Sequence, residues 1–340
     1  MNKCQCDSPG YCNFFNQEMT SNPPNWQWCQ SASEEERLQY KDNCDIKHKR
    51  KNFNNINGSF LTYQNLVDTC LNDLIPKLSK MNVSGIMGVP RSGYLPASIC
   101  ATSMNLPLYN IYGDQTKVAH SISEFGGYRM GNYKQKLGKI VVLDDTVFSG
   151  DTIQTLKGRF GDEYHYAALY VNPNRKNSVD VFAKELDEPH LLEWHFFNSD
   201  HVENTLFDLD GVFSPNIPLK HMESDDKYEE YISKADPIFH RLPKMFKCKG
   251  IVTARLDKFK KVTEEWLNRH GIKYDFLSMY PTEKRDIRDA NHVEEAGKYK
   301  AEVYKNSNAR FFMESEKAEG VVIRKMSNKL VILPNDGIFI

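Results

Sequence analysis

Residues 139–152 read Lys-Ile-Val-Val-Leu-Asp-Asp-Thr-Val-Phe-Ser-Gly-Asp-Thr, and this stretch decides the fold around it. Its four apolar residues, 140–143, predict a buried strand, and a helical pattern begins at Ile153. Asp144 and Asp145 lie where the strand should end, so their carboxylates can face the hydroxyls of a sugar. The candidate loop residues are Thr146, Val147, Phe148, Ser149, Gly150, Asp151 and Thr152. Because a loop that enters a helix offers backbone N–H groups to a phosphate, the stretch predicts a sugar-phosphate site.

A second strand–loop–helix pattern lies upstream, at residues 85–97 (Gly-Ile-Met-Gly-Val-Pro-Arg-Ser-Gly-Tyr-Leu-Pro-Ala). Arg91 is its only charged residue, and Ser92 and Gly93 allow a ligand to approach the backbone closely. The candidate binding residues of this loop are Val89, Pro90, Arg91, Ser92 and Gly93. This loop therefore predicts a place for a second anionic group.

Together and in this order, the two stretches resemble the type I phosphoribosyltransferases. Residues 139–152 match the family's motif for 5-phosphoribosyl 1-pyrophosphate (PRPP): a hydrophobic strand, Asp-Asp, three variable residues, Thr/Ser-Gly, one residue and Thr, with Ser149 at the Thr/Ser position. The upstream loop resembles the family's pyrophosphate loop. The resemblance implies that Asp144 and Asp145 hold the ribose hydroxyls, directly or through Mg²⁺. It also implies that the following loop holds the 5-phosphate and the upstream loop holds the leaving pyrophosphate.

Two other segments gain a candidate role from this resemblance. In the family a mobile loop between the two motifs closes over the pyrophosphate, and here residues 114–136 would supply charge through Lys117 or Arg129, unless they form a mere surface loop. Trp194 and Phe182 lie in a segment that resembles the tail of purine-type members, which contacts the base. They are candidates either for stacking on an acceptor or for packing in the core.

A different phosphate chemistry is indicated further along the chain. Residues 205–217 read Thr-Leu-Phe-Asp-Leu-Asp-Gly-Val-Phe-Ser-Pro-Asn-Ile, an apolar strand that ends in two acids, Asp208 and Asp210. Alternate residues of a strand lie on one face, so both carboxylates can bind Mg²⁺. One can then attack phosphorus while the other transfers a proton.

This stretch resembles the first motif of the haloacid dehalogenase (HAD) superfamily, most of whose members are phosphatases, and three further motifs follow in order. Thr253 ends a predicted strand and matches the phosphate-binding hydroxyl. Lys300 matches the charge-stabilising lysine, with Lys298 as the nearby alternative. Glu314, with Glu316 as its alternative, matches the second metal-binding segment, although the commoner form of that motif is rich in Asp. The implied Mg²⁺ ligands are Asp208, Asp210 and Glu314.

The first 44 residues contain five of the eight cysteines and little helical or strand periodicity. In a reducing cytoplasm such a segment favours a metal over disulfides. A structural zinc site or, as the runner-up, an iron–sulfur cluster would take four thiolates, and unligated thiols are the remaining alternative. The candidate ligands are Cys4, Cys6, Cys12 and Cys29, which leaves Cys44 as the spare.

Length and composition bound the rest. A chain of 340 residues predicts two or three domains, and we expect a Cys-rich segment at 1–50, a phosphoribosyltransferase domain at 51–200 and a HAD-like domain at 201–340, the latter two both α/β with parallel sheets. The formal net charge of −1 gives no electrostatic case for a nucleic-acid partner. No apolar run approaches the roughly 20 residues of a bilayer span, and the N-terminus lacks a signal peptide, so we expect a soluble cytoplasmic protein.

The combination predicts a bifunctional enzyme that works in sequence. The first domain would transfer 5-phosphoribosyl from PRPP to an acceptor, and the second would hydrolyse the 5-phosphate. A glycan or lipid-linked glycan is the favoured acceptor, and the family's inversion of PRPP implies a β-ribofuranosyl product. The alternatives are a nucleobase phosphoribosyltransferase coupled to a nucleotidase and a PRPP-binding regulatory protein. The sequence does not indicate the linkage or the oligomeric state.

Overall fold

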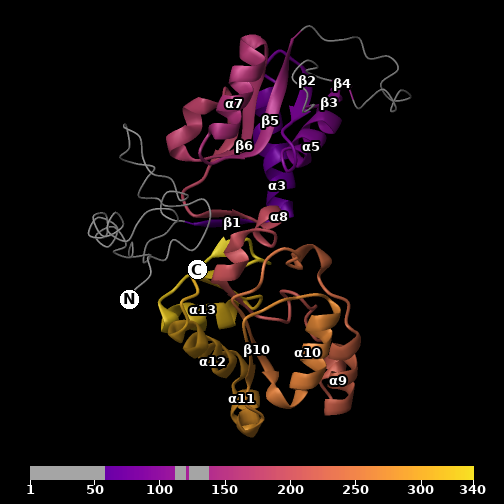
Figure 1. Cartoon of the computed structure of the whole chain (residues 1–340), viewed down its shortest axis with the longest axis vertical. Coiled ribbons are helices and arrows are strands. Elements are labelled where there is room, and N and C mark those ends of the chain that lie inside the picture. The colour runs from indigo at the N-terminus through magenta and orange to yellow at the C-terminus, as the bar shows by residue number, and fades with distance from the viewer. Residues whose placement is uncertain (1–57, 112–119, 122–137) are drawn as a thin grey trace, which may run out of the picture. The chain divides into compact units, whose positions relative to one another are not determined.

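The computed structural model describes residues 58–111, 120–121 and 138–340, and two six-stranded sheets form the framework of this part (Figure 1). The first sheet has the order β4-β3-β2-β5-β6-β7 and is parallel except for β4, which runs antiparallel to β3. Its strands are β2 Val83–Gly88, β3 Leu108–Asn110, β4 His120–Ser121, β5 Lys139–Val147, β6 His165–Val171 and β7 Val181–Glu185. Because β2 and β5 are parallel neighbours, the loops that follow them meet at one edge.

Helices cover both faces of this sheet. On β5, Val141 and Leu143 pack in one hydrophobic cluster and Val142 packs in another, so the strand is buried on both sides. The first face carries α3 Tyr63–Thr69, the π-helical turn Cys70–Leu74, α4 Ile75–Leu78 and α5 Tyr94–Met104, and the second carries α7 Asp151–Phe160. Burial on both faces is the reason why the strand reads as a continuous apolar run.

The strand that carries the acid pair is longer than the sequence predicts. β5 continues past Leu143 to Val147, since Thr146 and Val147 still pair with Tyr170 and Val171 of β6. The prediction that the strand ends at Leu143 is therefore wrong, because two further β-branched residues extend the ladder. Helix α7 correspondingly begins at Asp151, two residues before the predicted start.

A short strand precedes the helical segment of residues 63–78. Phe60 belongs to strand β1 Ser59–Leu61, which pairs in parallel with β8 His190–Leu192 in a separate two-stranded sheet. The helix begins only after Thr62, whose hydroxyl accepts a hydrogen bond from the backbone N–H of Asn65 over 3.2 Å. An N-cap of this kind marks the boundary between strand and helix.

The second sheet has the order β11-β10-β9-β12-β13-β14, and only β14 is antiparallel to its neighbour. Its strands are β9 Thr205–Phe207, β10 Gly250–Leu256, β11 Leu277–Tyr280, β12 Phe311–Met313, β13 Val331–Leu333 and β14 Ile338–Phe339. The helices are α9 Asp225–Lys234, α10 Lys260–Arg269, α11 Arg285–Ala290, α12 His292–Asn306 and α13 Lys317–Ser327, with α9 and α10 on one side of the sheet and α12 and α13 on the other (Figure 1). Both sheets are thus helix-covered and mainly parallel.

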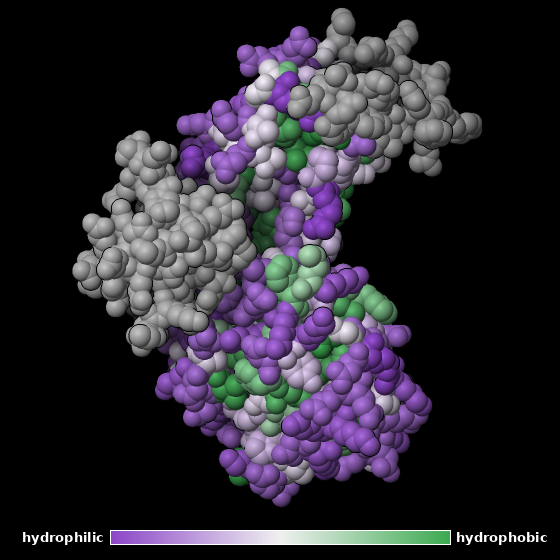
Figure 2. All heavy atoms as spheres, in the orientation of Figure 1, coloured by the Kyte–Doolittle hydropathy of each residue, from purple (hydrophilic) through white to green (hydrophobic). Residues whose placement is uncertain are grey.

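Amphipathic helices explain the surface of this second part. In α10, for example, Val262, Trp266 and Leu267 are buried, as the apolar spacing predicts. The face that Figure 2 shows over α9 and α10 is correspondingly hydrophilic. Among the described residues, none of the helices combines the length and the apolar character that a bilayer span requires.

The short connection between the two sheets is itself packed. It contains β8 and helix α8 Glu193–Phe196. Phe60 and Phe196 lie in the same hydrophobic cluster as Phe207 of β9. The described residues from 58 onward belong to one compact unit. The remaining short 3₁₀ turns are Gly161–Glu163, Pro173–Ser178, Asp200–Asn204, Leu219–His221, Phe239–Arg241, Asp257–Phe259 and Thr282–Lys284.

Candidate functional site

The predicted acid pair is buried near the carboxyl end of β5. Asp144 is 8% exposed and Asp145 is 2% exposed. The hydroxyl of Ser92, in the upstream loop, donates a hydrogen bond to Oδ1 of Asp145 over 3.0 Å. The structure therefore brings the two sequence motifs together on one carboxylate.

The other oxygen of Asp145 is held by two residues that follow β8. The indole Nε1 of Trp194 donates to Oδ2 over 2.6 Å, and Nε2 of His195 lies 3.0 Å from the same oxygen. Burial by itself would raise the pKa of Asp145, but the contacts with His195 and Trp194 outweigh it, so the pKa is lowered. Asp145 is therefore the ionised member of the pair.

Asp144 has the opposite character. Its Oδ1 accepts a hydrogen bond from the backbone N–H of Asp145 over 2.9 Å. Burial, followed by the adjacent negative charge of Asp145, raises the pKa of Asp144 to about 8. Two adjacent acids with pKa values moved in opposite directions are typical of a functional site.

The upstream loop is packed tightly under the ends of β2 and β5. A Cβ on Gly93 would lie 2.6 Å from the carbonyl oxygen of Val89 and 2.8 Å from that of Leu143, so only glycine fits there. Pro90 and Arg91 are exposed, and the peptide bond between them is cis. The loop thus anchors its glycine inside and presents its arginine to solvent.

The downstream loop is the turn from β5 into α7. Gly150 has φ of +88°, a conformation that favours glycine. The Ser149 hydroxyl donates to Oδ2 of Asp151 over 2.8 Å, and both side chains lie at the start of the helix. Thr146 instead faces His190, with Oγ1 and Nε2 3.2 Å apart. Thr146 and Val147 thus belong to β5, and the turn into α7 follows at residues 148–150.

Trp194 and Phe182, the candidate acceptor-stacking residues, both pack inside the protein. Trp194 is 8% exposed and stacks on Tyr170 with ring centroids 6.5 Å apart. Phe182 is half-buried in the cluster beneath α7, and Nζ of Lys77 lies 5.3 Å from its ring centroid. The structure therefore favours the core-packing alternative for these two rings.

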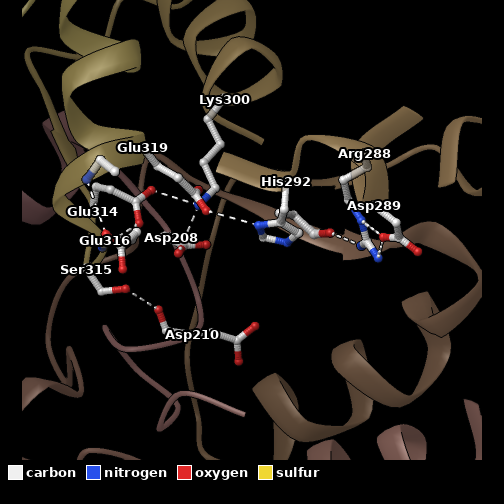
Figure 3. Close-up of polar contacts among 12 residues, drawn as sticks. Asp208, Asp210, Arg288, Asp289, His292, Lys300, Glu314, Ser315, Glu316 and Glu319 are labelled. Carbon is white, nitrogen blue, oxygen red and sulfur yellow. Dashed lines mark hydrogen bonds and ion pairs between the residues drawn. The ribbon is translucent and has the colours of Figure 1, made fainter. Parts of the chain in front are cut away.

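A second charged cluster lies at the carboxyl end of β9 (Figure 3). The ammonium of Lys300 lies 3.0 Å from Oδ2 of Asp208, 2.7 Å from Oε2 of Glu314 and 2.7 Å from Oε2 of Glu319. All four residues are at most 5% exposed. Burial and the charge of Glu314 raise the pKa of Asp208 to about 8, whereas the three carboxylates raise the pKa of Lys300 despite its burial.

Asp210 lies beside this cluster but has different partners. Nε and Nη2 of Arg255 donate to its two carboxylate oxygens over 2.9 and 2.6 Å, and Arg255 is 1% exposed. The hydroxyl of Ser315 donates to the backbone oxygen of Asp210 over 2.8 Å (Figure 3). Thr253 is buried on β10, and its hydroxyl accepts from the backbone N–H of Arg255 over 3.3 Å.

The structure distinguishes between the alternatives that the sequence leaves open. Lys298 is at the surface and pairs with Glu294 and Glu295, while Lys300 is inside the cluster. Glu316 caps α13 by accepting from the backbone N–H of Ala318, while Glu314 contacts Lys300. The lysine and the glutamate that the motifs favour are thus the ones brought together.

Sequence reasoning missed three residues of these sites. Glu319 lies five residues after Glu314, on the first turn of α13, where a second acid beside a lysine could have been sought. Arg255 lies two residues after Thr253, and an arginine at that position is a candidate partner for a strand-end acid. His195 directly follows Trp194, and nothing in its local pattern indicates that it meets Asp145.

The acidic side chains around Asp208 have the charge that a divalent cation needs, but they are not positioned around a metal ion. Among the described residues, no group of three or more His, Cys, Asp and Glu side chains is arranged to hold a metal. The carboxylates of Asp208, Glu314 and Glu319 converge instead on one ammonium. When ionised they carry an excess of negative charge, and carboxylate oxygens are the ligands that Mg²⁺ prefers. The residues present therefore fit Mg²⁺ by chemical type.

Several predicted residues lie outside the described part of the chain. They are Lys117 and Arg129 of the predicted closing loop, and the cysteines Cys4, Cys6, Cys12, Cys29 and Cys44. Their roles stay predictions.

Comparison with known proteins gives structural likenesses to part of the chain. No protein-family model matches it, and no curated protein sequence matches it. A purine phosphoribosyltransferase from Pyrococcus horikoshii is similar at 22% identity and a TM-score of 0.29, over 41% of this chain and 94% of that one. A xanthine-guanine-hypoxanthine phosphoribosyltransferase from Helicobacter pylori has 17% identity and a TM-score of 0.30, over 42% and 94%. An orotate phosphoribosyltransferase from Aeropyrum pernix has 17% identity and a TM-score of 0.26, over 36% and 71%. These likenesses each cover less than half of this chain.

Proposed function

We propose that this protein transfers 5-phosphoribosyl from PRPP to an acceptor hydroxyl. One observation carries the proposal: the buried carboxylate of Asp145 accepts a hydrogen bond from Ser92, at an edge where two strand–loop–helix turns meet. Each turn can bind an anionic group, and the acid between them can bind sugar hydroxyls. PRPP carries a phosphate and a pyrophosphate on one ribose, so it matches the order of these groups.

The roles of the residues follow from this placement. Asp144 and Asp145 hold the ribose hydroxyls, and the turn of residues 148–152 holds the 5-phosphate. Arg91, exposed on the upstream loop, neutralises the leaving pyrophosphate together with the backbone of that loop. The transition state at C1 is oxocarbenium-like, so positioning and charge stabilisation supply most of the catalysis.

We further propose that the cluster at Asp208 is a phosphatase site of the HAD type. Asp208 would attack phosphorus through its carboxylate, and Lys300 would hold the charge of the attacked phosphate. Thr253 would bind a phosphate oxygen, and Asp210, fixed by Arg255, would exchange the proton. Asp208, Asp210 and Glu314 would hold Mg²⁺, which when bound polarises a phosphoryl oxygen.

The two activities fit one reaction sequence. Transfer from PRPP leaves a 5-phosphate on the added ribose, and a phosphatase in the same chain removes it, so the product is a ribofuranosyl group. We propose a glycan or lipid-linked glycan as the acceptor, reached from the cytoplasm, and a β-linkage because the family's reaction inverts PRPP. The N-terminal cysteines would hold zinc or an iron–sulfur cluster.

Pyrophosphate release from PRPP tests the proposal. We expect Asp144→Asn combined with Asp145→Asn to abolish release with a lipid-linked glycan extract, while hydrolysis of p-nitrophenyl phosphate is retained. Asp162→Asn, which changes an exposed acid beyond the end of helix α7 and outside both loops, is the matched control and should keep most of both activities. Loss of both activities in the double variant, or release that depends only on free nucleobases, would contradict the proposal.

A further inference from the structure

We infer that His195 is the general base that takes the proton from the acceptor hydroxyl. The inference rests on the proposed transfer reaction and adds a residue to it that the sequence motifs do not contain. It is carried by the position of the imidazole on Asp145, by its exposure and by the way the upstream loop reaches the same carboxylate.

One nitrogen of the imidazole contacts Asp145, and the side chain as a whole is partly exposed. Nε2 lies 3.0 Å from Oδ2 of Asp145, and the side chain of His195 is 38% exposed against 3% for Asp145. Because Asp145 is ionised, it selects the tautomer that carries hydrogen on Nε2. The lone pair of Nδ1 is then available to accept a proton.

The upstream loop and His195 approach Asp145 through different oxygens. Ser92 donates to Oδ1, whereas His195 and Trp194 contact Oδ2. Ser92 of the upstream loop and His195 thus contact the same carboxylate. A ribose bound at Asp145 would therefore lie close both to the loop proposed for the leaving pyrophosphate and to the imidazole proposed as the base.

The other histidine beside β5 does not fit this role. His190 is 8% exposed, its Nε2 faces the hydroxyl of Thr146, and burial lowers its pKa. Glu193, which precedes Trp194, is 4% exposed and is paired with Arg241 over 3.0 Å. Of these three titratable side chains, His195 is the one that combines contact with Asp145 and access to an incoming acceptor.

The step balances without a further reactant. The C1–O bond to pyrophosphate breaks, and its electron pair leaves with the pyrophosphate oxygen. The acceptor oxygen forms the new bond to C1, and its proton moves to Nδ1 of His195. The protonated ring, stabilised by Asp145, later releases the proton to solvent.

Small nucleophiles test this role without an identified acceptor. We would incubate the full chain with PRPP and Mg²⁺ and supply either methanol, which must lose a proton, or azide, which has none to lose. We expect His195→Gln to slow methyl riboside formation by about 100-fold, the lower range of general-base effects. Azide should still give the ribosyl azide at the wild-type rate. His165→Gln, at the start of β6, is the matched control and should leave both reactions unchanged.

The outcomes distinguish a general-base role of His195 from a positioning role. An equal fall with methanol and azide would assign His195 a positioning role only and overturn the inference, as would unchanged methanol transfer. His195→Ala gives a second variant, in which added imidazole should restore the methanol reaction if the ring acts as a base. Failure of the wild type to release pyrophosphate from PRPP with any acceptor would instead reject the proposed transfer itself.

Discussion

The indole Nε1 of Trp194 donates a 2.6 Å hydrogen bond to Oδ2 of Asp145, which joins the segment after β8 to the strand that carries the acid pair. Both residues are buried, so this contact is not exchanged readily with water. It gives Asp145 a donor without an opposing charge, beside the contact that His195 makes to the same oxygen. These contacts therefore hold the orientation of the Asp145 carboxylate and favour its ionised form.

We expect Trp194→Phe to destabilise the protein and weaken PRPP binding. The change removes the donor from a buried carboxylate, at a cost of about 1–3 kcal/mol in the free energy of unfolding. Urea denaturation and calorimetric titration with PRPP measure the two effects. Trp266→Phe is the matched control, since its Nε1 donates to the backbone oxygen of Ala235 over 2.7 Å in the second sheet's layer. That variant should lose stability yet bind PRPP normally, and equal binding by both variants would contradict the role of Trp194.

Asp144 should make the folded protein less stable as the pH rises. The fold raises the pKa of Asp144 to about 8, whereas an aspartate in an unfolded chain has a pKa of about 3.9. Between these values the folded state keeps a proton that the unfolded state has released, so stability falls with increasing pH. The contribution is at most about 1.4 kcal/mol per pH unit.

Unfolding by urea between pH 5 and pH 8 measures this dependence. Asp144→Asn should lose stability less steeply over that range than the wild type does. Asp145, whose pKa is lowered, titrates below the range and should not contribute to the difference. Identical pH slopes for wild type and Asp144→Asn would show that Asp144 is ionised in the fold.

An added methyl group should destabilise the protein in the upstream loop but not in helix α7. Gly93→Ala places Cβ 2.6 Å from a backbone oxygen, which forces the loop to move and costs about 1–3 kcal/mol. Gly158→Ala meets nothing within 4 Å in helix α7 and should stabilise the protein by up to about 1 kcal/mol. Thermal unfolding and PRPP titration measure the stability and the PRPP affinity of both variants. Normal PRPP affinity in Gly93→Ala would show that the loop does not bind PRPP.

Lys300→Met should be strongly destabilising near neutral pH. The methionine leaves the three buried carboxylates without a cation, and breaking a buried ion pair in this way costs about 3–5 kcal/mol. Lys298→Met removes an exposed lysine from the same helix, paired with Glu294 and Glu295, and should change stability by at most about 1 kcal/mol. Similar urea midpoints for the two variants would show that Lys300 does not neutralise the cluster.

The sequence is informative about the strands because both sheets are buried on two faces. Continuous apolar runs such as 140–143 leave no other arrangement than a covered strand, and acids at the ends of these runs indicate the edge where ligands bind. The ends of elements are less predictable. Thr146 and Val147 extend β5 because residues of β6 pair with them. Pairing between distant strands cannot be predicted from the local sequence pattern.

Residues that reach a site from another element are the hardest to foresee. Glu319 comes from a helix rather than from the strand end, and His195 reaches Asp145 because β8 pairs with β1. Trp194 is of a residue type that often stacks on ligands, yet its ring packs in the core. Its indole nitrogen donates a hydrogen bond to Asp145. Such contacts depend on the path of the chain, so periodicity and spacing do not predict them.

Mass spectrometry of the transfer product tests the central claim most directly. Wild type and Asp208→Asn would be incubated side by side with PRPP, Mg²⁺ and an extract of lipid-linked glycans. We predict that the wild type adds a pentose and that Asp208→Asn adds a phosphopentose, because only the second reaction is blocked. An unmodified glycan fraction with the wild type, or a phosphate-free pentose with Asp208→Asn, would contradict transfer followed by dephosphorylation.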